Sequence, residues 1–169
     1  PKDADVVHFQ FNPETEIDFP FLMTEHGHAD KVINLPKNTV FLSRKHAQCH
    51  GSTQFVYNGL DWGNYGAVDF NNSRNNYHFL GKAARRIKNI KGAIRVANLA
   101  KAQLDVLGGD RFNVRGGFRW TLAPQVHFHG MVGGQEKLQR LQASRGLIFP
   151  VRWHEPFGLA TIESLYFGC

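Results

Sequence analysis

The sequence contains little cysteine and no long apolar run. Cys49 and Cys169 are its two cysteines, and neither belongs to a C-x-x-C pair. Two isolated cysteines exclude a disulfide-rich scaffold and disfavour a structural zinc site. No apolar stretch approaches the ~20 residues that a membrane-spanning helix needs. We therefore expect a soluble, cytoplasmic chain, with peripheral contact at the inner membrane surface as an open alternative.

Several ligand-binding motifs are also missing. There is no G-x-G-x-x-G loop for a nicotinamide cofactor, and Lys82 is not followed by the Ser or Thr of a G-x-x-x-x-G-K-[ST] phosphate loop. The zinc motif H-E-x-x-H is absent because Pro156 follows Glu155. His127 and His129 share a strand face, but no carboxylate or cysteine lies near them in sequence. We expect neither a metal nor a cofactor.

The positive charge is unevenly distributed. The net charge is +6, but residues 1–76 carry six Lys/Arg against nine Asp/Glu, whereas residues 77–169 carry fourteen against five. The basic second half favours anionic partners such as nucleotides, phosphates, nucleic acid or an anionic membrane surface. No aromatic RNA-binding pattern accompanies the basic run, so we expect no nucleic-acid partner.

A polar segment divides the chain. Residues 61–76 are rich in Asn and Gly, and they coincide with the change in charge. We interpret this segment as a linker between one domain over residues 1–60 and a second over residues 77–169.

The apolar pattern predicts an α/β fold. Short apolar runs before the linker are typical of buried strands, and after it strands alternate with helices. Such alternation predicts parallel, Rossmann-like sheets with ligands at the carboxyl ends of the strands. Residues 110–124 fit no element and are expected to be a loop or a hairpin insertion. The predicted strands are 6–9, 20–23, 40–42, 54–57, 77–80, 104–107, 126–130 and 147–149. The predicted helices are 43–50, 91–103 and 135–143. We expect Ser43 to cap the first helix, and the second to carry an apolar stripe that includes Val96.

Two carboxylates, Glu155 and Glu163, lie eight positions apart near the end of the chain. Pro156 has a fixed φ and no N–H, so it suits the first turn of a helix, which we expect to begin near Phe157. The free N–H groups of that turn would form an anion site at the positive end of the helix dipole. We expect these amides to be those of Phe157, Gly158 and Leu159, and the apolar face of the helix to consist of Leu159, Ile162 and Leu165.

The string Glu155-Pro-Phe-Gly-Leu-x-x-x-Glu163, followed by a small-residue helix that ends in Gly168-Cys169, resembles the E-x7-E motif of the family 4 retaining glycosyltransferases. Phe79-Leu80-Gly81-Lys82 with Lys91-Gly92 resembles the family pattern F-x-G-[RK]-x(n)-K-G. The gap is longer here, which leaves open whether Lys91 or the nearer Arg85 and Arg86 supply the second cation.

Two further segments carry the resemblance in the first half. Thr24-Glu25-His26-Gly27 resembles the strand end T-x-H-G, and Asn58-Gly59-Leu60-Asp61 resembles the N-G-h-D element at the domain crossover. The resemblance implies a B-type fold of two Rossmann-like domains. It also implies that this chain holds the trailing half of the N-terminal domain and a C-terminal domain that is truncated at its end.

The resemblance implies the transfer of a hexose, with retention, from a nucleotide-diphosphate sugar to a sugar or lipid-linked alcohol. It implies no metal and no clear enzyme nucleophile. Each part of the donor then has implied contacts: Gly81, Lys82 and Lys91 for the diphosphate; the catalytic positions Glu155 and His26 for the transferred sugar; the amides of Phe157, Gly158 and Leu159 for sugar and phosphate; Glu163 for the ribose; and His129, Gly130 and Met131 near the base.

Three alternatives stay open from the residues themselves. The chain could be a non-catalytic nucleotide-sugar-binding fragment, or an epimerase or phosphorylase with the same fold, although no Schiff-base lysine for a phosphorylase cofactor is identifiable. A basic nucleic-acid-binding module is the third, and it predicts binding that weakens steeply with salt.

Overall fold

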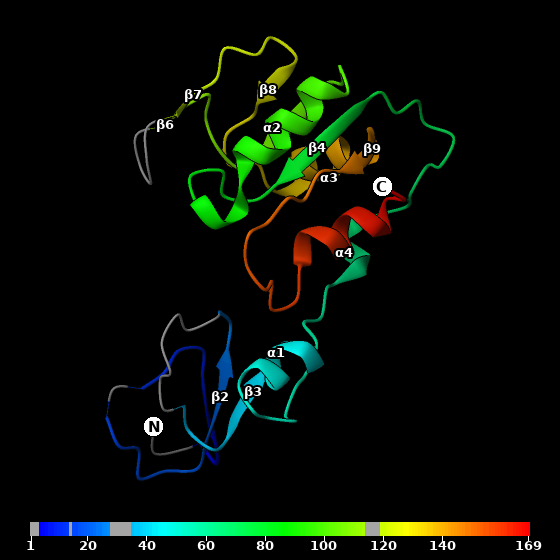
Figure 1. The fold of residues 1–169 in the computed structure, drawn as a ribbon. Coiled ribbons are helices and arrows are strands. Elements are labelled where there is room, and N and C mark those ends of the chain that lie inside the picture. Colours follow the sequence, from blue (N-terminus) through cyan, green and yellow to red (C-terminus); the bar gives the residue numbers. More distant parts are fainter. Residues whose placement is uncertain (1–3, 14, 28–34, 114–118) are drawn as a thin grey trace. The chain divides into compact units, whose positions relative to one another are not determined.

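The computed structural model describes residues 4–13, 15–27, 35–113 and 119–169, which form two compact units (Figure 1). The first unit runs to Leu60 and adds His154–Gly158, and the second comprises Asp61–Trp153 with Leu159–Cys169. Among the described residues, no helix is both long enough and apolar enough to cross a bilayer.

The first unit is a small parallel sheet with one helix. Its strands are β1 (Val7–Phe9), β2 (Phe21–Glu25) and β3 (Thr39–Phe41), in the order β1-β2-β3. Helix α1 (Arg44–Cys49) follows β3, and Ser43 caps it by accepting a hydrogen bond from the His46 N–H at 3.1 Å, so the predicted cap is confirmed. Met23, Phe41 and Ala47 are buried between sheet and helix.

The predicted strand 54–57 is wrong as a full strand. Only Phe55 pairs, through a single parallel bridge to Phe41. Val56 and Tyr57 are exposed at 66% and 56%, so this segment lacks the buried face that would hold it against β3. The Tyr57 ring instead lies 6.0 Å from the ring of Phe157.

The second unit contains a four-stranded parallel sheet in the order β8-β5-β4-β9. Its strands are β4 (Asn76–Leu80), β5 (Leu104–Leu107), β8 (Val126–Phe128) and β9 (Ser144–Leu147). The predicted α/β fold with parallel sheets is confirmed. β9 begins three residues before the expected run 147–149, because the hydroxyl of Ser144 is hydrogen-bonded inside the sheet and a polar residue can therefore occupy a buried strand position.

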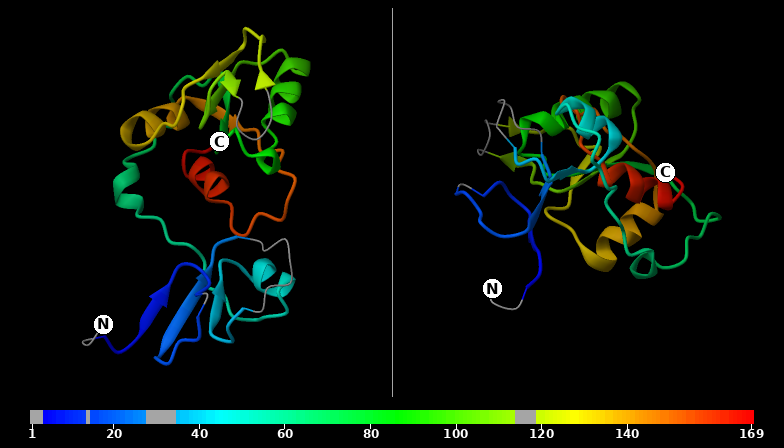
Figure 2. Two further views of the ribbon diagram at one scale, coloured as in Figure 1. Left: turned by 90° about the vertical axis from the view of Figure 1, so that its left-hand side faces the viewer. Right: turned by 90° about the horizontal axis from the view of Figure 1, so that it is seen from below.

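Helices cover both faces of this sheet, as Figure 2 shows. Helix α2 (Ile90–Leu99) packs Ala93 and Ala97 against one face, where Phe79, Val106 and Val126 are buried. Helix α3 (Gly134–Gln142) contributes the buried Leu141 to the other face, beside Leu107 and Phe167. The expected apolar stripe of α2 is wrong at Val96, which is 48% exposed because the helix turns it about 100° away from its buried neighbour Ala97.

Helix α4 (Leu159–Tyr166) starts later than the proline suggests. Pro156 and Phe157 lie in a bend before it, and Gly158 has φ +89°. This left-handed backbone conformation favours glycine and is incompatible with a helix that already runs through Phe157. The anion site expected from three consecutive helical amides therefore retains only Leu159 inside the helix.

The expected apolar face of α4 is also wrong. Leu159 and Leu165 are 41% and 60% exposed, whereas Glu163 and Ser164 are buried. Both polar side chains can be buried because each one forms a hydrogen bond within the protein.

The segment 110–124, which was expected to be a loop or a hairpin insertion, contains a small hairpin. Strand β6 (Phe112–Asn113) pairs antiparallel with β7 (Arg119–Trp120), and residues 114–118 lie outside the described part of the chain. Two short 3-10 helices complete the second unit, η1 (Trp62–Tyr65) within the expected linker and η2 (Arg86–Lys88) before α2.

Candidate functional site

Glycines bring the carboxyl ends of three neighbouring strands close together. Gly81 follows β4, and its N–H donates to Leu107 O at 3.0 Å. Gly108 has φ +132°, and a Cβ added to it would lie 2.2 Å from Gly81 O, so only glycine fits there. The Gly109 N–H donates to Gly130 O at 3.1 Å and ties β5 to β8. These strand ends form the carboxyl edge of the sheet, which is where ligands bind in parallel α/β sheets.

Two lysines lie beside this edge. Lys82 is exposed directly after Gly81, and Lys91 is exposed in the first turn of α2. Neither lysine has an ion-pair partner among the described residues. The start of α2 is fixed by Asn89, whose side chain accepts a hydrogen bond from Gly92 N–H at 3.2 Å. Two exposed cations at a strand-to-helix connection form an electropositive position for an anion.

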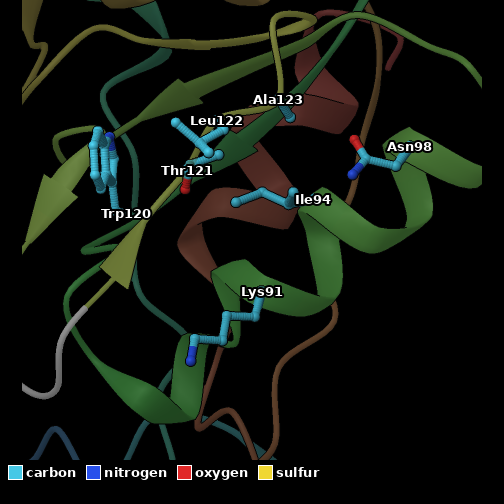
Figure 3. Close-up of a pocket in the computed structure, with 7 residues that line it drawn as sticks. All are labelled: Lys91, Ile94, Asn98, Trp120, Thr121, Leu122 and Ala123. Carbon is cyan, nitrogen blue, oxygen red and sulfur yellow. The ribbon is translucent and has the colours of Figure 1, made fainter.

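Lys91 also lines a hollow of about 320 Å³ between α2 and the segment after β7 (Figure 3). Figure 3 shows Lys91 at the end of the hollow nearest the start of α2, with Trp120 across from the helix. The Trp120 side chain is 63% exposed. The remaining lining residues are Ile94, Asn98, Thr121, Leu122 and Ala123.

Glu163 is buried and tightly held on α4. The Tyr65 hydroxyl donates to Glu163 Oε1 at 2.6 Å, and the Lys137 ammonium forms an ion pair with the same oxygen. Burial first, and then the neighbouring Glu163 carboxylate, raise the pKa of Tyr65 above its ordinary value. The phenol therefore stays protonated and acts as a donor. Sequence reasoning missed both Tyr65 and Lys137, because each lies far from Glu163 along the chain and belongs to no motif that we identified.

Aromatic contacts hold the segment after Asp61 on α4. The Trp62 ring stacks on the Tyr166 ring at 4.7 Å, and the Tyr65 ring meets Tyr166 edge-on at 5.5 Å. The Tyr166 hydroxyl donates to Gly66 O at 2.6 Å, and Arg74 donates to Phe167 O at 2.6 Å. This part of the expected linker is therefore packed against the second unit.

His129 lies on the α3 side of the sheet. Its Nε2 is 2.7 Å from Asp105 Oδ1 and 3.3 Å from a guanidinium nitrogen of Arg140. Asp105 also accepts a hydrogen bond from Asn76 at 2.9 Å. The ring expected near the base is thus engaged by neighbouring side chains. Of the other two residues expected near the base, Gly130 pairs with Gly109, and the side chain of Met131 is 69% exposed.

A second histidine, His78, is fully buried in the centre of the unit. Its Nδ1 lies 2.6 Å from the Ser144 hydroxyl, and its Nε2 lies 2.8 Å from the Ser164 hydroxyl. Burial lowers the pKa of His78 to about 4, against a smaller opposing effect of the Asp105 charge. The neutral ring therefore links β4, β9 and α4, and sequence analysis had not singled it out.

The remaining expected site residues belong to the first unit. His26 Nε2 lies 2.6 Å from Gln10 Oε1, where β1 and β2 end. Glu155 and Phe157 lie in the segment His154–Gly158, which the Ser43 hydroxyl anchors by donating to Pro156 O at 2.5 Å. Among the described residues, no group of three or more His, Cys, Asp or Glu side chains could hold a metal ion.

Comparison with known proteins identifies the fold class. No model of a protein family and no curated protein matches the sequence. Among solved structures, AviGT4, a glycosyltransferase involved in avilamycin A biosynthesis, matches 96% of this chain with a TM-score of 0.71 and 19% sequence identity. The match covers 52% of the AviGT4 chain, so this chain spans about half its length. The fold is that of a part of a B-type glycosyltransferase.

Proposed function

We propose that this chain is the donor-binding part of a retaining glycosyltransferase that moves a hexose from a nucleotide-diphosphate sugar to an alcohol acceptor. The observation that carries the proposal is a pair of exposed lysines at the carboxyl edge of a parallel sheet, Lys82 and Lys91, which form no ion pair with any residue that the structure describes. A diphosphate gains negative charge as the bond between sugar and phosphate breaks. Fixed cations beside it would stabilise that charge in the transition state.

The other donor contacts follow from the second unit and from the resemblance together. Gly81 has no side chain, so its backbone would let the phosphates approach closely, although its N–H is bonded to Leu107 O. Backbone amides at the start of α4 would donate to the phosphates, with the helix dipole adding to the attraction. Glu163 would accept hydrogen bonds from the ribose hydroxyls. Gly130 and Met131 would lie near the base. Because the His129 side chain is bonded to Asp105, backbone groups of this segment would contact the base in its place.

In the first unit, Glu155 and His26 keep the roles that the resemblance implies, which are contacts with the transferred sugar. The proposal assigns neither of them as a nucleophile. The leaving diphosphate can itself accept the proton of the incoming alcohol, so that the new bond forms on the face from which the diphosphate departs. The residues of the site need only hold the two reactants and stabilise the charge.

A panel of nucleoside diphosphates in a thermal-unfolding assay tests this function. A ligand that binds only the folded chain stabilises it by about 2.7 kcal/mol at a hundredfold excess over its Kd. We expect at least one uridine, guanosine or adenosine diphosphate to raise the unfolding temperature, and Lys82→Ala to reduce that shift. The absence of a shift with every nucleoside diphosphate would contradict the proposal.

The second unit by itself holds both lysines and Glu163, so a non-catalytic nucleotide-binding role is the second candidate. The two candidates differ in the fate of a bound nucleotide sugar. Release of free nucleoside diphosphate in the presence of alcohol acceptors supports the transferase, whereas binding of the nucleotide sugar without release supports the non-catalytic role.

A further inference from the structure

Two hydrogen-bond donors converge on one oxygen of Glu163 and leave the other oxygen open. The Tyr65 hydroxyl and the Lys137 ammonium both donate to Oε1. Oε2 has no hydrogen-bond partner within the described part of the chain, and it is not among the atoms sealed from solvent. The side chain of Glu163 as a whole is only 11% exposed, so a ligand can reach only a small part of it.

The two donors lie on two different elements, η1 and α3, and both reach Glu163 on α4. The Tyr65 ring on η1 contacts the rings of Tyr166 and Phe167, with centroid distances of 5.5 and 6.3 Å. Lys137 on α3 reaches Glu163 on α4, and its Nζ lies 5.5 Å from the centroid of the Tyr65 ring. A carboxylate fixed from two directions cannot rotate freely, and its open oxygen therefore keeps one direction.

The Glu163 side chain is buried beside a cation and a hydroxyl donor. A buried carboxylate is costly unless a cation and hydrogen bonds compensate for its lost hydration, and Lys137 with Tyr65 supplies both. Burial and the adjacent carboxylate raise the pKa of Tyr65, so this phenol remains a neutral donor and does not compete as an anion. An ionised oxygen with free lone pairs accepts hydrogen bonds and donates none.

We propose that Tyr65 and Lys137 are positioning residues that hold Oε1 of Glu163 so that Oε2 accepts hydrogen bonds from vicinal hydroxyls of a ligand. The inference rests on the proposed function, in which that ligand is the ribose of a nucleotide. An oxygen with two lone pairs can accept from both the 2′- and the 3′-hydroxyl. The cluster would thus determine the preference for ribose over 2′-deoxyribose, since a site built to bond a hydroxyl discriminates strongly against its absence.

The hydroxyl of Tyr65 can be tested with a matched control. Tyr65→Phe removes the bond to Oε1, whereas Tyr166→Phe removes a hydroxyl of the same aromatic cluster that donates to Gly66 O. Affinities are measured by calorimetry for uridine and guanosine diphosphates and for their 2′-deoxy counterparts. We expect Tyr65→Phe to weaken ribonucleotide binding about five- to tenfold and 2′-deoxynucleotide binding less than about twofold, which matches the net contribution of one typical hydrogen bond. Tyr166→Phe should leave the ratio of the two affinities unchanged.

The ammonium of Lys137 is tested in the same way. Lys137→Met keeps the length of the side chain and removes the charge, Lys101→Met makes the same charge change at an exposed position, and Lys137→Arg restores a cation. We expect the preference for ribose to fall in Lys137→Met, to persist in Lys101→Met and to recover in Lys137→Arg. Unfolding temperatures without ligand show whether each variant is folded. If Lys137→Met does not fold, Tyr65→Phe, which is the smallest change, still tests the inference.

The outcomes separate this inference from the proposed function. Tighter ribonucleotide binding by Tyr65→Phe would mean that Tyr65 blocks the ribose position, and it would overturn the inference. An unchanged ratio of ribose to deoxyribose affinity in both Tyr65→Phe and Lys137→Met would overturn it as well, while leaving nucleotide binding intact. A wild-type chain that binds no nucleoside diphosphate would overturn the proposed function, and the inference with it.

Discussion

At the scale of single residues, the second unit depends on buried polar side chains that each have a specific partner. His78 lies between the hydroxyls of Ser144 and Ser164, and Glu163 lies between Tyr65 and Lys137. Buried polar groups of this kind are stable only in the protonation state that their partners match. His78 therefore makes the stability of the unit sensitive to mild acid.

The buried ring of His78 predicts a loss of stability below neutral pH. Its folded pKa of about 4 lies below the unfolded value of 6.5, so the unfolded chain binds the additional proton between these two values. The stability is fully present above the unfolded pKa and falls as the pH is lowered toward the folded one, by roughly 3 kcal/mol for a shift of this size. Denaturant unfolding as a function of pH measures it.

A matched pair of variants isolates this effect from other titrating groups. His78→Asn removes the proton-binding ring from the core, whereas His127→Asn removes an exposed ring that contacts Gln103. We expect the acid-dependent loss to be much smaller in His78→Asn and unchanged in His127→Asn. The same slope of stability against pH in both variants would show that other groups are responsible.

At the scale of elements, the carboxyl edge of the second sheet depends on glycines that allow strand ends to meet. Gly108 has a left-handed φ, and its Cα lies so close to the backbone of Gly81 that a methyl group would overlap with it. The loops after β4 and β5 cannot separate without breaking the hydrogen bond from Ala83 N–H to Gly108 O at 2.8 Å. The position of Lys82 is therefore coupled to Gly108.

Substitution of Gly108 by alanine should destabilise the second unit and disturb the proposed donor site. Backbone strain at such a position costs on the order of 1–3 kcal/mol, and the overlap with Gly81 adds to it, so we expect a loss of at least about 2 kcal/mol. Gly133→Ala is the control, because Gly133 has an extended backbone and no neighbouring atom within 4 Å of an added Cβ. A loss in Gly108→Ala no larger than in Gly133→Ala, as measured by denaturant unfolding, would contradict the close approach.

Local sequence patterns predicted features that depend only on neighbouring residues. The strand at Leu104–Leu107 and the cap at Ser43 are confirmed, since a run of branched side chains and a serine before a helix carry their signal locally. The apolar face of α4 and the start of β9 were wrong because Glu163 and Ser144 are buried with polar partners. Those partners come from distant parts of the chain, and no local pattern reveals them.

The same distinction applies to the candidate site. The E-x7-E string and the Gly81-Lys82 turn are contiguous motifs, and they could be recognised from the sequence alone. Tyr65 is 98 residues from Glu163 and Lys137 is 26 residues from it, so only the folded chain brings them together. His129 shows the converse, since its side chain is directed to Asp105 by the strand pairing of β5 with β8.

At the scale of the whole molecule, the chain forms two units, and it returns to the first unit for one short segment near its end. His154–Gly158 belongs to the first unit, while the sheet that precedes it and the helix that follows it belong to the second. The E-x7-E string thus begins in one unit at Glu155 and ends in the other at Glu163. Nucleotide binding is expected to depend on the second unit, which holds both lysines and Glu163.

The affinity difference between a nucleoside diphosphate and the corresponding monophosphate tests the central claim most directly. If Lys82 and Lys91 bind the second phosphate, calorimetry should show that the diphosphate binds at least about tenfold more tightly, and that Lys82→Ala with Lys91→Ala removes most of this difference, as expected for the loss of charge-assisted hydrogen bonds. The double variant should retain its affinity for the monophosphate to within about threefold. Equal affinity of the wild-type chain for both nucleotides, or a preference for the diphosphate that survives in the double variant, would contradict the assignment of this edge as the donor site.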